Sequence, residues 1–220
     1  MNPLKTAFAP GCALMLYKPE LAQKTHEFLN GSIGKMELYL TCCHHEPPFS
    51  EKKNIINICP GCNKRFKNDY HQTTTISLWE ILASSNDFPF PDYHGKTMTI
   101  LDACPTRNED QVQKSIRTLL KRMNINLIEP KKTRNKGTCC GDSFYGLIPV
   151  SDVKKQMIKR TNEMPTDDVV VYCVSCTKSI FIGGKKPHYL IDLLFNQETE
   201  QKTLDPDQWH KELDDYIAVH

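Results

Sequence analysis

Ten cysteines in this chain of 220 residues fall into two sets of five with the same order, and this duplication constrains the fold most strongly. In each set a single cysteine comes first, then two adjacent cysteines, then a C-x-x-C pair. The sets are Cys12, Cys42, Cys43, Cys59 and Cys62, and Cys104, Cys139, Cys140, Cys173 and Cys176. Self-similarity of this kind indicates repeated structural units. The chain is therefore predicted to contain two similar units of roughly 100 residues each.

The sequences around the last two cysteines of each set support the duplication. "IINICPGCNKRF" aligns with "VVVYCVSCTKSI", and farther along the chain "ISLWEIL" aligns with "HYLIDLLF". Proline and glycine cluster between the copies in "DFPFPDYHGK" (87–96), which is typical of a boundary. The predicted domains are therefore residues 1–94 and 95–220, the second of which ends in an amphipathic helix.

Short apolar or β-rich runs end just before most of the cysteines. Runs of this length without clean alternation are typical of buried parallel strands. The predicted strands are Thr6–Phe8, Met36–Leu40, Ile55–Ile58, Thr97–Leu101, Leu127–Ile128 and Val169–Tyr172. The predicted helices are Glu20–Leu29, Asp110–Met123 and Asp152–Asn162, with a short turn after each C-x-x-C pair.

The alternation of strands and helices predicts an α/β fold with a short parallel sheet and flanking helices in each unit. Sites in such sheets collect outside the carboxyl ends of the strands. The five cysteines of each set are therefore expected to converge on one edge of their sheet. Packing of the two units by pseudo-twofold symmetry would bring those edges face to face.

Adjacent cysteines are poor partners for a mutual disulfide, because their Cα atoms are only ~3.8 Å apart. They are well placed to offer two thiolates to one inorganic object. No apolar stretch is long enough for a secretory signal or a membrane span, so a cytoplasmic location is predicted. In that compartment ten cysteines favour metal or redox chemistry over disulfides. A net charge of +2 gives no reason to expect binding to nucleic acid or a membrane surface.

Simpler explanations account for only part of the pattern. Buried cysteines that act as small hydrophobes would not form two matched sets. A thioredoxin-like role for "CPGC" (59–62) leaves the adjacent pairs unexplained, and the second copy reads "CVSC". Structural zinc and cubane iron–sulfur clusters each take four ligands, whereas each set offers five. Five thiolates suit a larger or more open iron–sulfur cluster.

The second unit closely resembles the CCG, or cysteine-rich, domain of the family that contains the B subunit of heterodisulfide reductase. Cys104 is followed by 34 residues, then by Cys139–Cys140–Gly141, and 32 residues separate Cys140 from Cys173. The first unit departs from this pattern twice. His44 takes the place of the glycine, and only 15 residues separate Cys43 from Cys59.

The resemblance implies that the ten cysteines bind two noncubane [4Fe-4S] clusters. It further implies an oxidoreductase of anaerobic metabolism that cleaves a small disulfide held between the clusters, with one electron coming from each. The chain has no G-x-G-x-x-G motif after a strand, so it carries no flavin or nicotinamide signature. The electrons are therefore expected from a ferredoxin or from a partner iron–sulfur or flavin subunit.

Two other functions stay open at this point. CCG units also occur in subunits of lactate, glycolate, glycerol-3-phosphate and succinate oxidoreductases, where they pass electrons toward a quinone. The other is a zinc-binding interaction module, in which the cysteines are purely structural. Outside the cysteines, the candidate residues are His44 and His45, which could protonate a product thiolate or replace a ligand, although exposed loop histidines are the commoner explanation. Lys178, after the second C-x-x-C, is a candidate cation beside an anionic cluster.

Overall fold

The computed structural model describes residues 5–202 and 204–220, and the chain divides into two compact units. The first unit comprises Met1–Pro89 together with Glu212–His220, and the second comprises Phe90–Lys211. Helix α9 (Pro206–Val219) therefore begins in the second unit and ends in the first. A division of the chain at a single point, as in the predicted domains 1–94 and 95–220, does not anticipate this return of the C-terminus.

The first unit contains a four-stranded sheet in which every neighbouring pair of strands is parallel. Its order is β2-β1-β3-β4, with β1 Thr6–Ala9, β2 Glu37–Leu38, β3 Lys53–Asn57 and β4 Thr73–Ser77. The helices are α1 Cys12–Tyr17, α2 Pro19–Ser32, α3 Pro60–Asn68 and α4 Leu78–Ser84.

The second unit repeats this plan with the strand order β6-β5-β7-β8, again all parallel. The strands are β5 Thr97–Ile100, β6 Asn126–Ile128, β7 Asp168–Val171 and β8 Lys186–Tyr189. The α-helices before α9 are α5 Asp110–Arg122, α6 Val150–Asn162, α7 Val174–Ile182 and α8 Leu190–Leu194. Three short 3-10 turns lie at Cys104–Thr106, Arg134–Lys136 and Asp142–Phe144.

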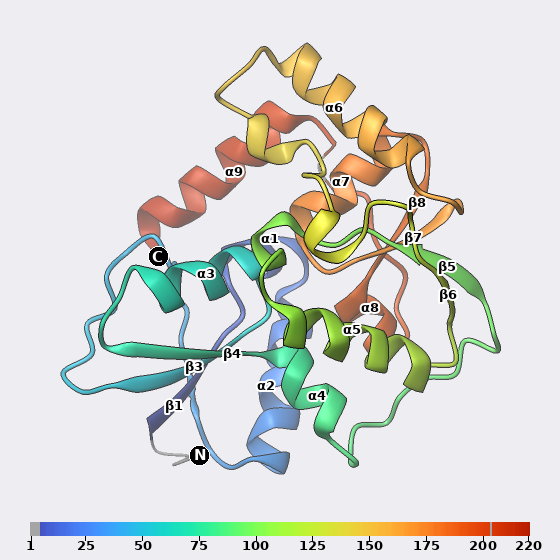
Figure 1. Ribbon diagram of the computed structural model, residues 1–220. Helices are drawn as coiled ribbons and strands as arrows, with labels where there is room; N and C mark the ends of the chain where they lie inside the picture. Colours follow the sequence, from blue (N-terminus) through green and yellow to red (C-terminus); the bar gives the residue numbers. More distant parts are fainter. Residues whose placement is uncertain (1–4, 203) are drawn as a thin grey trace. The chain divides into compact units, whose positions relative to one another are not determined.

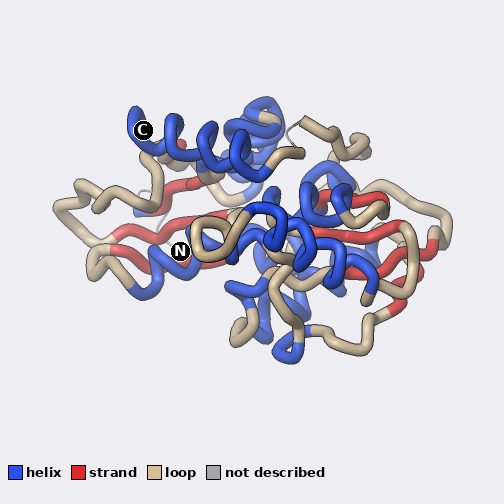
Figure 2. The backbone as a smooth tube through the Cα atoms, turned by 90° about the horizontal axis from the view of Figure 1, so that it is seen from above, coloured by secondary structure: helices blue, strands red, loops and turns tan. Residues whose placement is uncertain are grey.

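In both units the first strand pairs with the second and third strands, and the fourth pairs with the third (Figure 1). Helices flank the strands of each unit (Figure 2). These features confirm the predicted α/β fold with two similar units and parallel sheets. The predicted pseudo-twofold relation stays a prediction. Within the described part of the chain, no helix is both long and apolar enough to cross a bilayer.

Buried apolar side chains hold each sheet to its helices. The run Val169–Val171 in β7 has no exposed surface, as expected for a strand covered on both faces. In α5 the apolar face is buried, including Ile116, Leu119 and Leu120. Helix α4 begins with a capping box in which the Ser77 backbone N–H donates to the Glu80 carboxylate.

Helix α6 is the main difference between the two units. It lies next to α7 in Figure 1, and the Thr161 hydroxyl donates to the Ser179 carbonyl of α7 over 3.1 Å. In the first unit, the described residues between Cys43 and Cys59 form no helix. The short spacing noted in the sequence is therefore the absence of this helix.

The pair of His188 and Asp168, which joins β8 to β7 at 2.5 Å, predicts a loss of stability in acid. Burial lowers the pKa of His188 below its ordinary value of 6.5, although Asp168 opposes the shift. The folded protein therefore binds a proton less readily than the unfolded chain, and the free energy of unfolding should fall as the pH drops below about 6.5. His188→Gln should flatten this part of the curve of melting temperature against pH. An unchanged slope in that variant would contradict the assignment.

Candidate metal centres

The cysteines of the first set come together at the carboxyl edge of its sheet. Cys12 begins α1 just after β1, the adjacent pair follows β2, and Cys59 caps α3 just after β3. Parallel strands present these loops at one edge, so residues distant in the sequence become neighbours. Hydrogen bonds between thiols link all five in the order Cys12, Cys42, Cys43, Cys62 and Cys59.

The second set makes the same series of contacts. The thiols are linked in the order Cys104, Cys139, Cys140, Cys176 and Cys173. None of the ten cysteines is in a disulfide. Among residues 5–202 and 204–220, no three ligating side chains are grouped so as to hold a single metal ion. In each unit the thiols instead form an extended series of neighbours, with the first cysteine of the adjacent pair between two others.

The pKa values of the cysteines in one set show how many thiolates the set can hold without bound metal. Hydrogen bonds from Cys12 and Cys43 lower the pKa of Cys42 to about 2. The same bonds raise the pKa values of Cys12 and Cys43, and burial adds to the increase, although a hydrogen bond with Cys62 opposes it at Cys43. One thiolate is thus stabilised at the expense of its neighbours. Five thiolates require a compensating positive charge, which the iron ions of a cluster would supply.

Backbone and hydroxyl donors support the first cysteine of each pair. The Gly141 N–H donates to Cys139 Sγ over 3.3 Å, and Ser143 Oγ lies 2.8 Å from the same sulfur. In the first unit the backbone N–H of His44 donates to Cys42. Donors of this kind orient a sulfur ligand and raise the reduction potential of a cluster that it holds.

Gly11 leaves space beside the first set. Its φ is +82°, and a Cβ at this position would lie 3.2 Å from Cys62 Sγ and 3.3 Å from the Cys59 Cβ. Any larger residue would therefore press on two of the five cysteines. The donor set and this close backbone approach fit an iron–sulfur cluster, with the five cysteines of each set as its candidate ligands.

Gly141 is required for a different reason. Its φ is +112°, and a Cβ would lie 2.7 Å from the backbone N of Met157 in α6. The glycine after the second cysteine pair thus allows its loop to pack on α6. The first unit has no corresponding helix, and the non-glycine residues described with positive φ are His94, Asn124, Arg134 and Asn196. His44 can therefore stand where the second unit needs glycine.

Substitution of Gly141 by alanine is expected to destabilise the protein by about 2–4 kcal/mol, because it combines an unfavourable φ with a clash against helix backbone. Gly146→Ala is the matched control, since Gly146 has a φ of +76° but open space around its Cα. The control should cost about 1 kcal/mol. Urea unfolding of both variants measures the difference. Equal losses would show that contact with α6 does not require the glycine.

Lys178 lies buried beside the second set, with a side chain 3% exposed. Its Nζ is 2.7 Å from Asp142 Oδ1 and 5.6 Å from the centre of the Trp209 ring. His210 Nε2 lies 3.3 Å from the same carboxylate oxygen. Burial opposes ionisation of Asp142, but His210 and Lys178 outweigh it and hold the pKa of that carboxyl below its ordinary value. In the first unit the equivalent Lys64 is exposed, so the two sites differ in their nearby charge.

The two candidate histidines are both exposed. Electrostatic interaction with His44 contributes to the lowered pKa of Cys42, and His45 Nε2 lies 2.7 Å from the Ile217 carbonyl in α9. The roles suggested for these histidines stay predictions.

An ionic network centred on Asp102 lies behind the second set and was not predicted. The Asp102 carboxylate accepts hydrogen bonds from Arg117 Nη1 and Nη2 at 2.6 and 2.7 Å. It also accepts from the Arg134 backbone N–H at 2.8 Å and the Tyr172 hydroxyl at 3.1 Å. These contacts join the segments that lead to Cys104, to the adjacent pair and to Cys173.

Comparison with known families finds a match in the second unit. Residues 98–181 match the model of the CCG cysteine-rich domain, and this stretch contains all five cysteines of the second set. The curated proteins contain no match to the chain. CCG domains are associated with redox iron–sulfur proteins, and the clustered cysteines indicate iron–sulfur binding and electron transfer. Residues 98–181 of the second unit are thus similar to the CCG cysteine-rich domain.

Proposed function

We propose that the protein is an iron–sulfur disulfide reductase that resembles the B subunit of heterodisulfide reductase. Each set of five cysteines would hold one noncubane [4Fe-4S] cluster. The observation that carries this proposal is that the five thiols contact one another in the same order in both units. The ten free cysteines fit a reducing compartment, and we place the protein in the cytoplasm.

The overall reaction takes two electrons and two protons. A disulfide RS–SR′ accepts both, its S–S bond breaks, and the thiols RSH and R′SH leave. When bound, the clusters would supply one electron each, which suits a two-electron substrate and one-electron carriers. The electrons would be replaced by a one-electron donor protein, either a ferredoxin or a partner iron–sulfur or flavin subunit. Water or an exposed imidazole such as His44 would supply a proton.

The chain's own contribution is to hold the ligands and set their charge. The N–H groups of His44 and Gly141 donate to the first cysteine of each pair and would make each cluster easier to reduce. The ion pair of Lys178 and Asp142 lies beside the second site only. We therefore expect the two clusters to differ in reduction potential.

The content of iron, acid-labile sulfide and zinc in protein purified without oxygen tests the proposal first. About eight iron per chain, with EPR signals unlike those of cubanes, would support two noncubane sites. About four iron would restrict the chemistry to one unit and favour simple electron transfer to a quinone or a partner protein. Zinc without sulfide would overturn the redox function.

Turnover of a small disulfide with a chemical reductant then separates a reductase from an electron carrier. A reductase should release two thiols for every two electrons consumed. A protein that takes up electrons but leaves the disulfide intact would be an electron-transfer subunit.

A further inference from the structure

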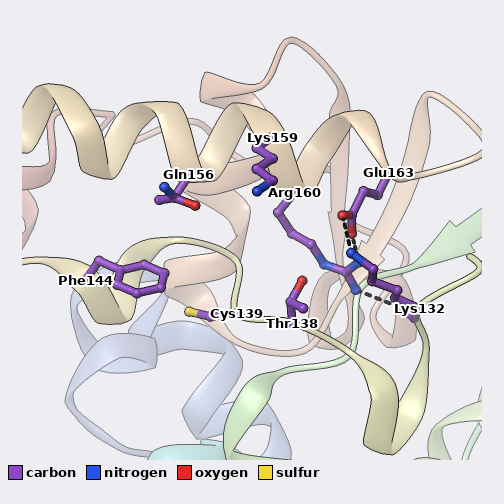
Figure 3. A pocket seen from close by; sticks show the side chains of 8 residues that line it. All are labelled: Lys132, Thr138, Cys139, Phe144, Gln156, Lys159, Arg160 and Glu163. Carbon is purple, nitrogen blue, oxygen red and sulfur yellow. Dashed lines mark hydrogen bonds and ion pairs between the residues drawn. The ribbon is translucent and has the colours of Figure 1, made fainter.

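A cavity of about 210 Å³ opens beside Cys139 in the second unit. One wall is α6, which provides Lys159 and Arg160, and the opposite wall is the loop around Cys139. Figure 3 shows the Cys139 sulfur, the Phe144 ring and the α6 side chains around this space. The first unit has no helix at the corresponding position, so the α6 wall of this cavity has no counterpart there.

The cavity is positively charged. Three cations line it, namely Lys132, Lys159 and Arg160, against the single carboxylate of Glu163. Glu163 already binds two of them, with 3.0 Å to Lys132 Nζ and 2.5 Å to Arg160 Nη1. Lys159 has no ion-pair partner among the residues that the structure describes. The lining therefore has an excess of positive charge that an anionic ligand would neutralise.

Arg160 also presents an unused hydrogen-bond donor. Its side chain is only 2% exposed, and Nη2 donates to the Lys132 carbonyl over 2.9 Å. Its Nε has no partner. In Figure 3 the Nε lies on the side of the guanidinium group nearer Thr138 and Cys139. A buried donor without a partner is destabilising, and an oxyanion in the cavity would give this donor a partner.

The cavity combines this charge with an apolar surface. Phe144 is 37% exposed, and its ring lies beside Cys139 in Figure 3. A ligand that fits both features has an oxyanion at one end and a short apolar segment next to it. The volume is below that of typical drug-sized sites, which indicates a small molecule.

We propose that this cavity binds the carboxylate- or phosphate-bearing end of the disulfide substrate. The identification of the ligand as the substrate rests on the proposed reductase function. The site itself requires only an organic oxyanion. Binding here places the anionic end against Lys159 and Arg160, and the apolar segment against Phe144. The remainder of the molecule extends past Cys139 toward the second set of cysteines. The second site therefore selects the substrate by charge.

Binding measured by calorimetry under anaerobic conditions, without reductant, tests the site. The probes are dithiodipropionate, a dianionic disulfide; adipate, a shorter dianion without sulfur; inorganic phosphate; bis(hydroxyethyl) disulfide, which is neutral; and cystamine, which is cationic. We expect the dianions to bind and the neutral and cationic disulfides to bind at least about tenfold more weakly. If adipate binds and phosphate does not, the natural ligand carries a carboxylate. If phosphate binds more tightly than adipate, the natural ligand is a phosphate ester.

Lys159→Gln should weaken binding of the dianions about tenfold, because it removes the cation that has no carboxylate partner. Lys155→Gln is the matched control on the same helix. Lys155 lies outside the cavity and pairs with Asp152 at 2.8 Å, so its loss should leave the affinity unchanged. Equal affinities of the wild-type and Lys159→Gln proteins would overturn the proposal. So would binding of the neutral disulfide as tight as that of the dianions.

These experiments distinguish a failure of the proposed anion-binding site from a failure of the proposed reductase function. Adipate contains no disulfide, so adipate binding that depends on Lys159 supports the site even if no disulfide is reduced. Reduction of the neutral and anionic disulfides with equal KM values, unaffected by Lys159→Gln, would leave the reductase standing and overturn the site.

Discussion

Replacing Cys140 by alanine is expected to remove about half of the iron and sulfide from protein purified without oxygen. Cys140 contacts both Cys139 and Cys176, so it occupies the middle of the second set. Alanine offers no ligand, and the remaining four thiols would be left in two separate groups. Iron and sulfide analysis gives the loss, and EPR identifies which signals disappear.

Cys43→Ala is the matched change in the first set, because Cys43 likewise contacts Cys42 and Cys62. If both sites hold a four-iron cluster, each single variant should keep about half of the iron and the double variant almost none. The spectrum that survives in each variant then belongs to the intact site. Full iron content in Cys140→Ala would contradict the assignment of that residue as a ligand.

The strands that precede the cysteines were predictable from the sequence because they are short runs of apolar or β-branched residues. The strands β4 and β8 were not predicted. The sequence of β8, "KPHY", contains few apolar residues, whereas that of β4, "TTTIS", is rich in β-branched residues but precedes no cysteine. Both strands lie at the edge of a sheet. A proline such as Pro187 weakens any strand signal, although an edge strand tolerates it. The order of strands in each sheet has no local signal at all.

The two sets of cysteines were predictable because their spacing is repeated. The polar groups around them were not. Asp142 and His210 are 68 residues apart, and Asp102 and Arg117 are 15 apart, yet each pair is in contact. Single charged residues have no periodicity, and in a sequence they resemble the solvated charges that most such residues are. Only the fold reveals that these charges are buried together.

The departure of the first unit from the CCG pattern has a physical explanation that the sequence alone does not supply. Two differences, His44 for glycine and the short spacing before Cys59, have one cause. Gly141 is needed because α6 approaches its backbone, and the short spacing removes that helix. The glycine is therefore a packing requirement of the second unit, whereas the order of thiol contacts is common to both units.

Substitution of Arg117 by methionine is expected to lower the free energy of unfolding by about 3–5 kcal/mol, because it leaves a buried carboxylate without its partner. The Asp102 side chain is 2% exposed. Burial opposes its ionisation, but Arg117 and the surrounding donors outweigh this and keep the pKa of Asp102 below its ordinary value. Urea unfolding under anaerobic conditions measures the loss, and iron analysis shows whether the second site still assembles.

Addition of Asp102→Asn to Arg117→Met distinguishes an uncompensated charge from a simple loss of packing. The asparagine keeps most of the shape of the carboxylate but has no charge, so the double variant should be more stable than Arg117→Met alone. A double variant no more stable than the single one would mean that the guanidinium group acts mainly by filling space. The double variant could also regain stability without regaining iron at the second site. Because Asp102 also binds the Arg134 N–H and the Tyr172 hydroxyl, the charged carboxylate would then be needed to hold the loops of the second set in place.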